Sequence, residues 1–313
     1  MIPGMRVAKR TKDELAEAKQ AINESFKRFK SIGEIVADTK FCYEVSELVR
    51  QVAVDEFNLS DPTPLFVNRA SAQLGDTIEI EETVNTMKAI RRHPGSHPMA
   101  FTPTKRKTSI TTKQYDLPFA MDLEKIIRRQ VDPSVFAEHA AQALSRVYIS
   151  TVLSAIDAAA TGTDHYSRNL RATKSGDVDA TTLDGVLRSL GDVNGDVFIA
   201  GRYYALFPIT SFTGYSNELV NEIHATGLIG RYKGARVVVL QDDFNWYYNS
   251  ATIPANRIYI GGGNKGAFLH ERDVSALNYQ SVDTERAWLK NGFRVDFGVT
   301  VLQPWKFRVI ELT

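Results

Sequence analysis

Hydrophobic residues follow a helical period most clearly in the middle of the chain. No proline or glycine interrupts the sequence between Pro133 and Gly162, and Asp132 suits the cap that precedes a helix. We therefore predict a helix over residues 133–160, about 42 Å long. Its main apolar face carries Phe136, Ala140, Ala143, Leu144, Val147, Tyr148, Val152 and Ala155, and a second face carries Ile149, Leu153 and Ile156. A helix that is apolar on two sides is covered on two sides. It is either a long core helix of an α+β protein or a spine against which sheets pack, and periodicity alone does not choose between the two.

The C-terminal region alternates between hydrophobic and polar residues, as a strand with one buried face does. One face carries Phe293, Val295, Phe297, Val299 and Val301, and the other carries Arg294, Asp296, Gly298 and Thr300. A last strand follows Pro304, with Trp305, Phe307 and Val309 inward. We expect antiparallel pairing with one solvent-exposed face, and we expect the apolar face to cover the long helix.

A second helical pattern lies near the N-terminus. Thr11 and Glu14 form a capping box, and an apolar stripe follows: Leu15, Ala18, Ile22, Phe26 and Phe29. Helical spacing continues over residues 41–57 until the segment 61–64 (DPTP) interrupts it. Residues 1–30 hold eight Lys or Arg against four acidic residues, with Arg6, Lys9, Arg10 and Lys12 near the start. This segment is either a solvated surface helix or an arm that lies on another subunit or near nucleic acid.

Between these helical regions the period changes to that of strands. Residues 77–81 alternate, residues 108–115 alternate again, and a segment rich in proline separates them. We predict a long hairpin with too little apolar content to fold by itself.

The charges of this hairpin are segregated. Its root carries Glu79, Glu81 and Glu82, whereas its tip carries Lys88, Arg91, Arg92, Lys105, Arg106 and Lys107, with no acid among residues 88–107. The hairpin is either kept soluble by these charges or is an arm that reaches an acidic surface of a neighbour or phosphates.

Residues 179–271 have the pattern of a compact α/β layer. A short helix is predicted over residues 181–190, ended by Gly191. Three apolar runs typical of buried strands follow at residues 197–199, 237–240 and 258–260, with helical segments around residues 203–207 and 217–224.

Composition adds few constraints. Apolar residues make up 43% of the 313 residues, charged residues 24%, and the formal net charge is +1, so any affinity for nucleic acid must come from local patches. The single cysteine, Cys42, cannot form an intrachain disulfide and fits a reducing compartment. We see no uninterrupted apolar run of membrane-spanning length and no secretory signal, and we expect folding in a cytosol without a membrane partner.

Candidate chemistry is sparse. The glycine-rich run over residues 261–266 lacks the Lys-Ser or Lys-Thr that a phosphate loop needs after its last glycine, and we predict a turn there. His93 and His97 have the spacing of helical zinc ligands, but the intervening proline and glycine exclude that helix. Asp242 and Asp243 follow a buried strand and form a weak candidate for a metal-dependent hydrolase. We therefore expect no enzymatic activity, no cofactor and no metal.

Three stretches, in their order along the chain, resemble those of a known family: residues 196–206 (DVFIAGRYYAL), residues 227–239 (GLIGRYKGARVVV) and residues 286–296 (RAWLKNGFRVD). With the basic N-terminus, the charged hairpin and the long helix, they resemble the major capsid proteins of tailed bacteriophages. The resemblance implies an α+β protein with the fold first described for phage Hong Kong ninety-seven.

The resemblance also implies a division of the chain. It implies an N-terminal arm over residues 1–66, an extended loop over 67–118, a peripheral domain over 119–178 and 272–313 with the long helix as its spine, and an axial domain over 179–271. The glycine-rich turn of the axial domain would be formed by Gly227, Gly230 and Gly234.

As a function, the resemblance implies a structural subunit that assembles with itself, as hexamers and pentamers, into an icosahedral head around double-stranded DNA bound without sequence specificity. Assembly would take place in the bacterial host cytoplasm, and the product would be the virion. Separate scaffolding, portal and decoration proteins would be partners, since no large segment precedes the arm. Two alternatives stay open: an encapsulin-like compartment that shares the fold, and a nucleic-acid-binding protein that uses the basic hairpin.

Overall fold

The computed structural model describes residues 11–72, 79–84, 104–162, 170–194, 196–213, 215–216, 218, 221, 223, 229–240, 252–263, 266–272, 279–283 and 286–313. The helices are α1 (Lys12–Ser25), α2 (Ile32–Ala37), α3 (Thr39–Ser60), α4 (Leu123–Ile127), α5 (Ser134–Ala160), α6 (Ala180–Asn194) and α7 (Tyr203–Leu206). The strands are β1 (Val67–Ala72), β2 (Glu79–Val84), β3 (Thr104–Ser109), β4 (Lys113–Asp122), β5 (Arg171–Lys174), β6 (Val197–Gly201), β7 (Arg231–Tyr232), β8 (Ala235–Val239), β9 (Arg257–Gly262), β10 (Ala267–Arg272), β11 (Tyr279–Asp283), β12 (Trp288–Val301) and β13 (Phe307–Leu312).

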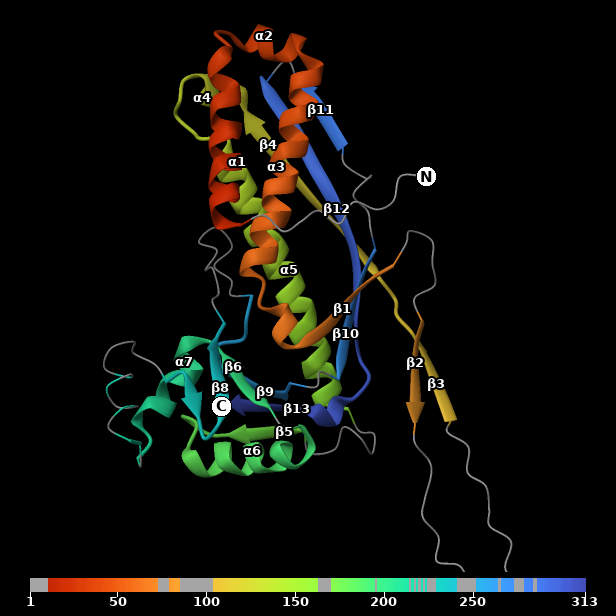
Figure 1. Ribbon diagram of the computed structural model, residues 1–313, viewed down its shortest axis with the longest axis vertical. Helices are drawn as coiled ribbons and strands as arrows, with labels where there is room; N and C mark the ends of the chain where they lie inside the picture. The colour runs from red at the N-terminus through yellow and green to blue at the C-terminus, as the bar shows by residue number, and fades with distance from the viewer. Residues whose placement is uncertain are drawn as a thin grey trace, which may run out of the picture.

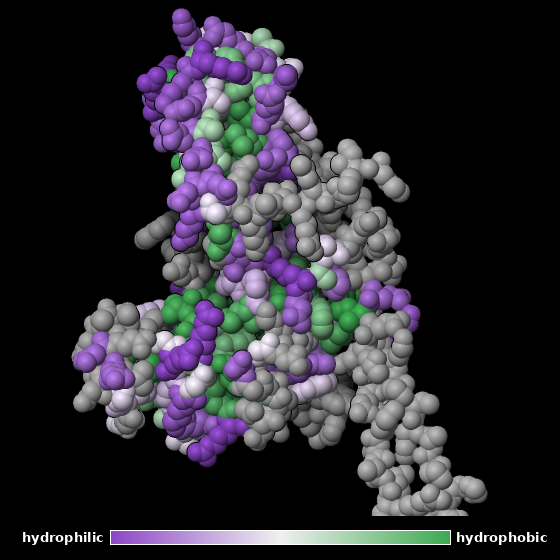
Figure 2. Space-filling view, viewed as in Figure 1, coloured by the Kyte–Doolittle hydropathy of each residue, from purple (hydrophilic) through white to green (hydrophobic). Residues whose placement is uncertain are grey.

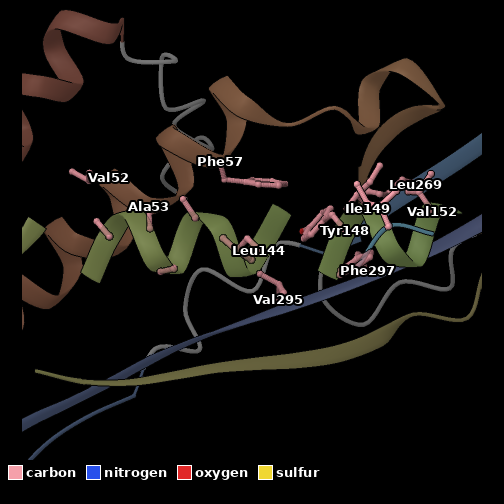
Figure 3. Close-up of a cluster of buried hydrophobic side chains, with 14 of the residues drawn as sticks. Val52, Ala53, Phe57, Leu144, Tyr148, Ile149, Val152, Leu269, Val295 and Phe297 are labelled. Atoms are coloured by element: carbon pink, nitrogen blue, oxygen red, sulfur yellow. The ribbon is translucent and has the colours of Figure 1, made fainter. Parts of the chain in front are cut away.

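The predicted long helix is α5, and it is the centre of the main hydrophobic core. Figure 1 shows it running from the N-terminal helices to the lower sheet. Figure 3 shows Phe57 of α3 on one side of α5 and Phe297 of β12 on the other. The ring of Tyr148 lies between them, with centroid distances of 4.8 Å to Phe57 and 4.0 Å to Phe297. The two-sided covering expected from the sequence is therefore confirmed.

By length and composition alone, α5 is apolar enough to cross a membrane. The helix passes by its average composition and is not an uninterrupted apolar run, because Glu138, Arg146 and Asp157 lie within it. In this fold the apolar side chains of α5 pack against α3 and β12, and a long core helix passes the same compositional test as a membrane span.

The predicted N-terminal cap of α5 is wrong. Pro133 has helical dihedral angles (φ −59°, ψ −27°), as predicted for the first helical position, and the hydrogen-bonded helix runs over Ser134–Ala160. Asn23 of α1 supplies the cap instead of Asp132. Its Oδ1 accepts a hydrogen bond from the Ser134 N–H at 3.1 Å, and its Nδ2 donates to Ser134 Oγ at 3.2 Å.

The N-terminal helices pack on this same chain. Leu15 and Ile22 of α1 are buried in the main core, and Lys19 donates to Glu56 of α3 at 3.1 Å and to Glu138 of α5 at 2.7 Å. Figure 2 shows a mostly hydrophilic outer surface on these helices, with hydrophobic residues in the seam between them. For residues 11–30 the structure therefore favours the surface-helix interpretation over the arm.

A five-stranded sheet covers one side of α5. Its order is β1-β10-β12-β11, and β4 pairs with β12. β1 is parallel to β10, and the other pairs are antiparallel. Val295 and Phe297 are buried against the core as predicted. The opposite face of β12 is not fully solvent-exposed, contrary to expectation, because Asp296 is buried as well.

A six-stranded sheet lies at the other end of the molecule, in the order β5-β13-β9-β6-β8-β7. The three predicted buried strands are its neighbouring members β9, β6 and β8. α6 packs on β6 and β9 and continues through Gly191, which the sequence placed at its end. β13 lies in this sheet, with Phe307 and Val309 buried as predicted, whereas Trp305 belongs to a half-buried 3-10 turn before it. The glycine-rich run predicted as a turn connects β9 to β10 and so joins the two sheets.

Candidate assembly surfaces

The predicted hairpin is the antiparallel pair β2–β3, with register from Glu79 opposite Ser109 to Val84 opposite Thr104. It forms a sheet of its own, and Figure 1 shows it projecting beside the body of the molecule. Lys107 Nζ lies 3.4 Å from the Glu79 carboxylate, and both side chains are about half exposed. The structure therefore brings one basic residue of the predicted set next to one acidic residue of the root.

For the other predicted hairpin residues, the structure gives the strand that carries each one or does not describe the residue. In the register of the pair, Glu81 lies opposite Lys107 and Glu82 lies opposite Arg106, with Lys105 opposite Thr83. For residues 105–107 the predicted separation of an acidic root from a basic tip is therefore wrong, because pairing of the two strands brings both charges to the same level of the hairpin. The tip residues Lys88, Arg91 and Arg92 lie outside the described residues.

The root of the hairpin crosses the five-stranded sheet at a glycine. A Cβ atom on Gly298 would lie 2.5 Å from the carbonyl oxygen of Thr111 and 2.7 Å from Cγ2 of Ile110. These distances are shorter than any real contact, so only glycine fits under the crossing chain. The crossing breaks the strand predicted over residues 108–115: β3 ends at Ser109, and β4 starts at Lys113 in another sheet.

The axial-domain turn is the two-residue connection between β7 and β8. Lys233 and Gly234 have φ angles of 45° and 87°, the left-handed values that such a hairpin turn requires. The Gly230 carbonyl accepts from the Val237 N–H at 2.9 Å. Gly227, the third predicted glycine of this turn, lies outside the described residues.

Two side chains of this turn hold it against α6. Lys233 forms an ion pair with Asp184, and the Tyr232 hydroxyl donates to the same carboxylate at 2.9 Å. The hydrogen bond from Lys233 holds the pKa of Asp184 below its ordinary value. Burial, followed by the nearby Asp184 carboxylate, raises the pKa of Tyr232. The turn is therefore fixed in orientation, and its basic residue is neutralised.

The predicted basic N-terminus is described from Thr11 onward. The capping box is formed: the Thr11 N–H donates to Glu14 Oε2 at 2.7 Å, and the Glu14 N–H donates to Thr11 Oγ1 at 3.3 Å. Lys12 is exposed in the first turn of α1. Arg6, Lys9 and Arg10 lie outside the described residues.

Sequence reasoning missed a charged cluster that joins α5 to the six-stranded sheet. Asp157, near the C-terminal end of α5, forms an ion pair with Arg257 and accepts from the Tyr259 hydroxyl at 3.1 Å. Arg257 also lies 3.4 Å from Glu311, which pairs with Arg171. The Arg171 guanidinium holds the pKa of Glu311 below its ordinary value. Asp157 and Arg257 are 100 residues apart in the sequence, so no local pattern signals the cluster.

The described residues offer no metal centre: they contain no group of three or more His, Cys, Asp or Glu side chains that could hold an ion. The candidates Asp242, Asp243, His93 and His97 lie in segments that the structure leaves undescribed.

Comparisons with known proteins identify the family. A family model described as "SPbeta prophage-derived putative capsid protein YonB" matches residues 5–305. No curated protein sequence matches the chain.

Solved structures show what the fold is similar to. The mature capsid of bacteriophage PhiM1 is 14% identical with a TM-score of 0.54, covering 79% of this chain and 85% of that one. A chain of Gordonia phage Cozz is 15% identical with a TM-score of 0.54, covering 80% and 85%. The capsid of a native GTA particle is 11% identical with a TM-score of 0.55, covering 80% and 89%.

At these low sequence identities the solved structures show only the fold. It is the fold of tailed-phage capsid subunits of the Hong Kong ninety-seven type. The family is given by the match over most of the sequence. This fold and this family are found in structural proteins of the virion and not in enzymes. The chain belongs to the family described as "SPbeta prophage-derived putative capsid protein YonB".

Proposed function

We propose that copies of this chain assemble, as hexamers and pentamers, into an icosahedral head that encloses double-stranded DNA. The observation that carries the proposal is the β2–β3 pair, which forms a separate two-stranded sheet. An isolated hairpin is at best marginally stable in water, and ordering its backbone costs entropy that some contact must offset. A neighbouring subunit supplies that contact.

The charges of the hairpin support a second copy as the partner. The paired strands carry acidic residues on β2 and basic residues on β3, and both kinds of charge can lie against complementary patches of another copy in a closed symmetric array. A single exposed ion pair contributes only about 0–1 kcal/mol. A shell repeats each contact many times, so small contributions per subunit decide whether it forms.

We also propose the domain division derived from the sequence, with narrower limits for the loop. β1 and β4, at either end of residues 67–118, belong to the five-stranded sheet. The part that reaches a neighbour is therefore β2, β3 and the segment between them. The axial domain over 179–271 corresponds to α6, α7 and most of the six-stranded sheet, and the remainder surrounds α5.

Other partners follow from the same reasoning. With a net charge of +1, contact with packaged DNA depends on local basic groups such as those of residues 1–12. Scaffolding, portal and decoration proteins are separate chains in this scheme, and assembly takes place in the bacterial cytoplasm. The prophage origin of the family favours a phage head over an encapsulin-like compartment.

The test is to replace residues 79–109 with a short Gly-Ser linker. The cores around α5 and around the six-stranded sheet are untouched, so circular dichroism and thermal melting should match the wild-type subunit. Sedimentation velocity should then show subunits or small oligomers where the wild type gives particles. As a control, a Gly-Gly-Ser replacement of the exposed turn at residues 175–177, which keeps the glycine at position 176 with its φ of 73°, should leave particles intact. Closed shells from the hairpin deletion would contradict the proposal.

A further inference from the structure

Strand β4 is the longest strand at an edge of the two large sheets. It runs for ten residues, and among the described strands it pairs only with β12. The other edge strands of these sheets, β1, β11, β5 and β7, have six residues or fewer. An edge strand presents a row of unpaired backbone groups, to which another chain can add a strand. The outer edge of β4 is therefore the longest such row in the two sheets as the structure describes them.

The backbone hydrogen bonds of β4 show which of its residues face outward. The N–H of Leu123, the residue after β4, donates to the carbonyl of Ala287 at 3.0 Å, which continues the one-to-one register of β4 with β12. Along an antiparallel ladder, pairs that exchange hydrogen bonds alternate with pairs that do not. The odd-numbered residues of β4 therefore bond to β12, whereas the N–H and C=O groups of the even-numbered residues point to the open edge.

Pro118 is the middle member of this outward row. It lies opposite Gly292 in a pair without hydrogen bonds, so its ring occupies the position of an N–H that would point away from β12. The ladder with β12 therefore loses no bond. A strand added from outside would lack this donor and would meet the ring instead. One residue thus interrupts the outer edge without weakening the sheet.

The sequence around Pro118 would otherwise favour pairing. Tyr115, Leu117 and Phe119 pack against the main core, which holds the strand extended, and the residues between them are exposed. Residues 117–121 (LPFAM) carry no charge. Short segments of strand-forming residues with low charge and no proline are the ones that add to other chains as strands. The proline is therefore the feature that separates the edge of β4 from an adhesive one.

We propose that Pro118 keeps the outer edge of β4 from pairing with the same edge of a second copy of the chain. Two identical edges fit each other when they run antiparallel about a two-fold axis. With the axis at position 118, the two proline rings would meet at the centre of the pair, where both copies lack a donor. Subunits held in such dimers would be lost to a closed shell. Only this consequence rests on the proposed function, and the block at the edge does not.

The test is Pro118→Val in the full-length protein. Valine restores the outward N–H and favours strands, and the ladder with β12 keeps its bonds, so the variant should melt close to the wild type. A backbone hydrogen bond contributes roughly a fivefold increase in an association constant, and each copy regains one. Sedimentation velocity should therefore show dimers at a concentration at least roughly tenfold lower than any at which the wild type forms them. The same samples should show the infrared band of intermolecular β-sheet.

Ala120→Val is the matched control, because position 120 is also exposed and outward-facing on β4 but already has its N–H. This variant should sediment like the wild type. A double variant, Pro118→Val with Ala120→Pro, moves the proline to the next outward position and should abolish the dimers again.

Sedimentation of Pro118→Val that matches the wild type at every concentration would overturn the inference. Dimers formed equally by Ala120→Val, or dimers that persist in the double variant, would do the same. Loss of the folded subunit in Pro118→Val would assign the proline to the stability of the subunit and would also overturn it. If the wild type forms no particles, the proposed function fails, whereas the comparison of dimers among the variants still decides this inference.

Discussion

At the scale of single residues, Tyr148 is where the core around α5 converges. Its ring stacks on Phe297 and meets the Phe57 ring at an interplanar angle of 54°, and the Arg69 guanidinium lies 5.4 Å from the ring centroid. The Tyr148 hydroxyl donates to Glu271 at 2.6 Å. Burial is the first cause that raises the pKa of Tyr148, so the hydroxyl stays protonated and remains a donor. The sequence placed Tyr148 on the apolar face, but none of these partners lies near it in the sequence.

The main apolar face of α5 shows how well periodicity predicts the burial of individual residues. The sequence treats Leu144 and Val147 alike, yet Leu144 is fully buried and Val147 only half-buried. Leu144→Ala should reduce the free energy of unfolding by about 2–5 kcal/mol. Val147→Ala should cost clearly less, because part of its side chain is already in water. Chemical denaturation measures both, with the exposed Ser154→Ala as control. Equal losses at the two positions would contradict the packing described here.

At the scale of elements, the long helix and the buried strands could be predicted because each depends on local periodicity. The start of α1 could also be predicted, because its capping box is local. Other boundaries could not, because they depend on distant residues. The cap of α5 comes from Asn23, and the break between β3 and β4 comes from the close approach of Thr111 to Gly298. The sheet to which β13 belongs is likewise decided by its pairing with β9 and β5.

The cap leads to a prediction about α5. Asn23→Ala should lower the free energy of unfolding by about 0.5–2 kcal/mol, the usual effect of losing an N-terminal cap. Asn23→Asp keeps an acceptor for the Ser134 N–H and should recover most of this loss. Gln20→Ala, which removes only a hydrogen bond to Glu24 within α1, serves as the control. Identical melting of Asn23→Ala and Gln20→Ala would mean that Asn23 does not cap α5.

The contact between α6 and the β7–β8 turn should depend on pH. The pKa of Asp184 is lowered in the folded state, so its contribution to stability is complete above the unfolded value of 3.8 and is lost as the pH falls through the folded value. Asp184→Asn should therefore melt at a lower temperature near neutral pH. Its stability should also fall less steeply than that of the wild type at acidic pH. Parallel curves over the whole range would show that the carboxylate contributes nothing.

At the scale of the whole molecule, two cores are joined at the C-terminal end of α5, and a charged hairpin projects beside them (Figure 1). The hairpin could be predicted from the sequence, because it follows from alternation, but the placement of its charges could not, because the register of the two strands sets Lys107 and Arg106 opposite Glu81 and Glu82. The open edge of β4 could not be predicted either, because it depends on which strands pair with β12. In the proposed assembly, the hairpin acts as a contact between copies of the chain and the edge of β4 does not.

Electron microscopy of the purified full-length protein tests this account most directly. The protein should form closed, hollow particles of uniform size with icosahedral symmetry, and the walls of those particles should resolve into hexamers and pentamers of this chain. Sedimentation of the same sample should give one fast-moving species that dissociates to folded subunits under mild denaturant. A folded protein that stays monomeric at every concentration and ionic strength, or that forms only open aggregates, would contradict the account.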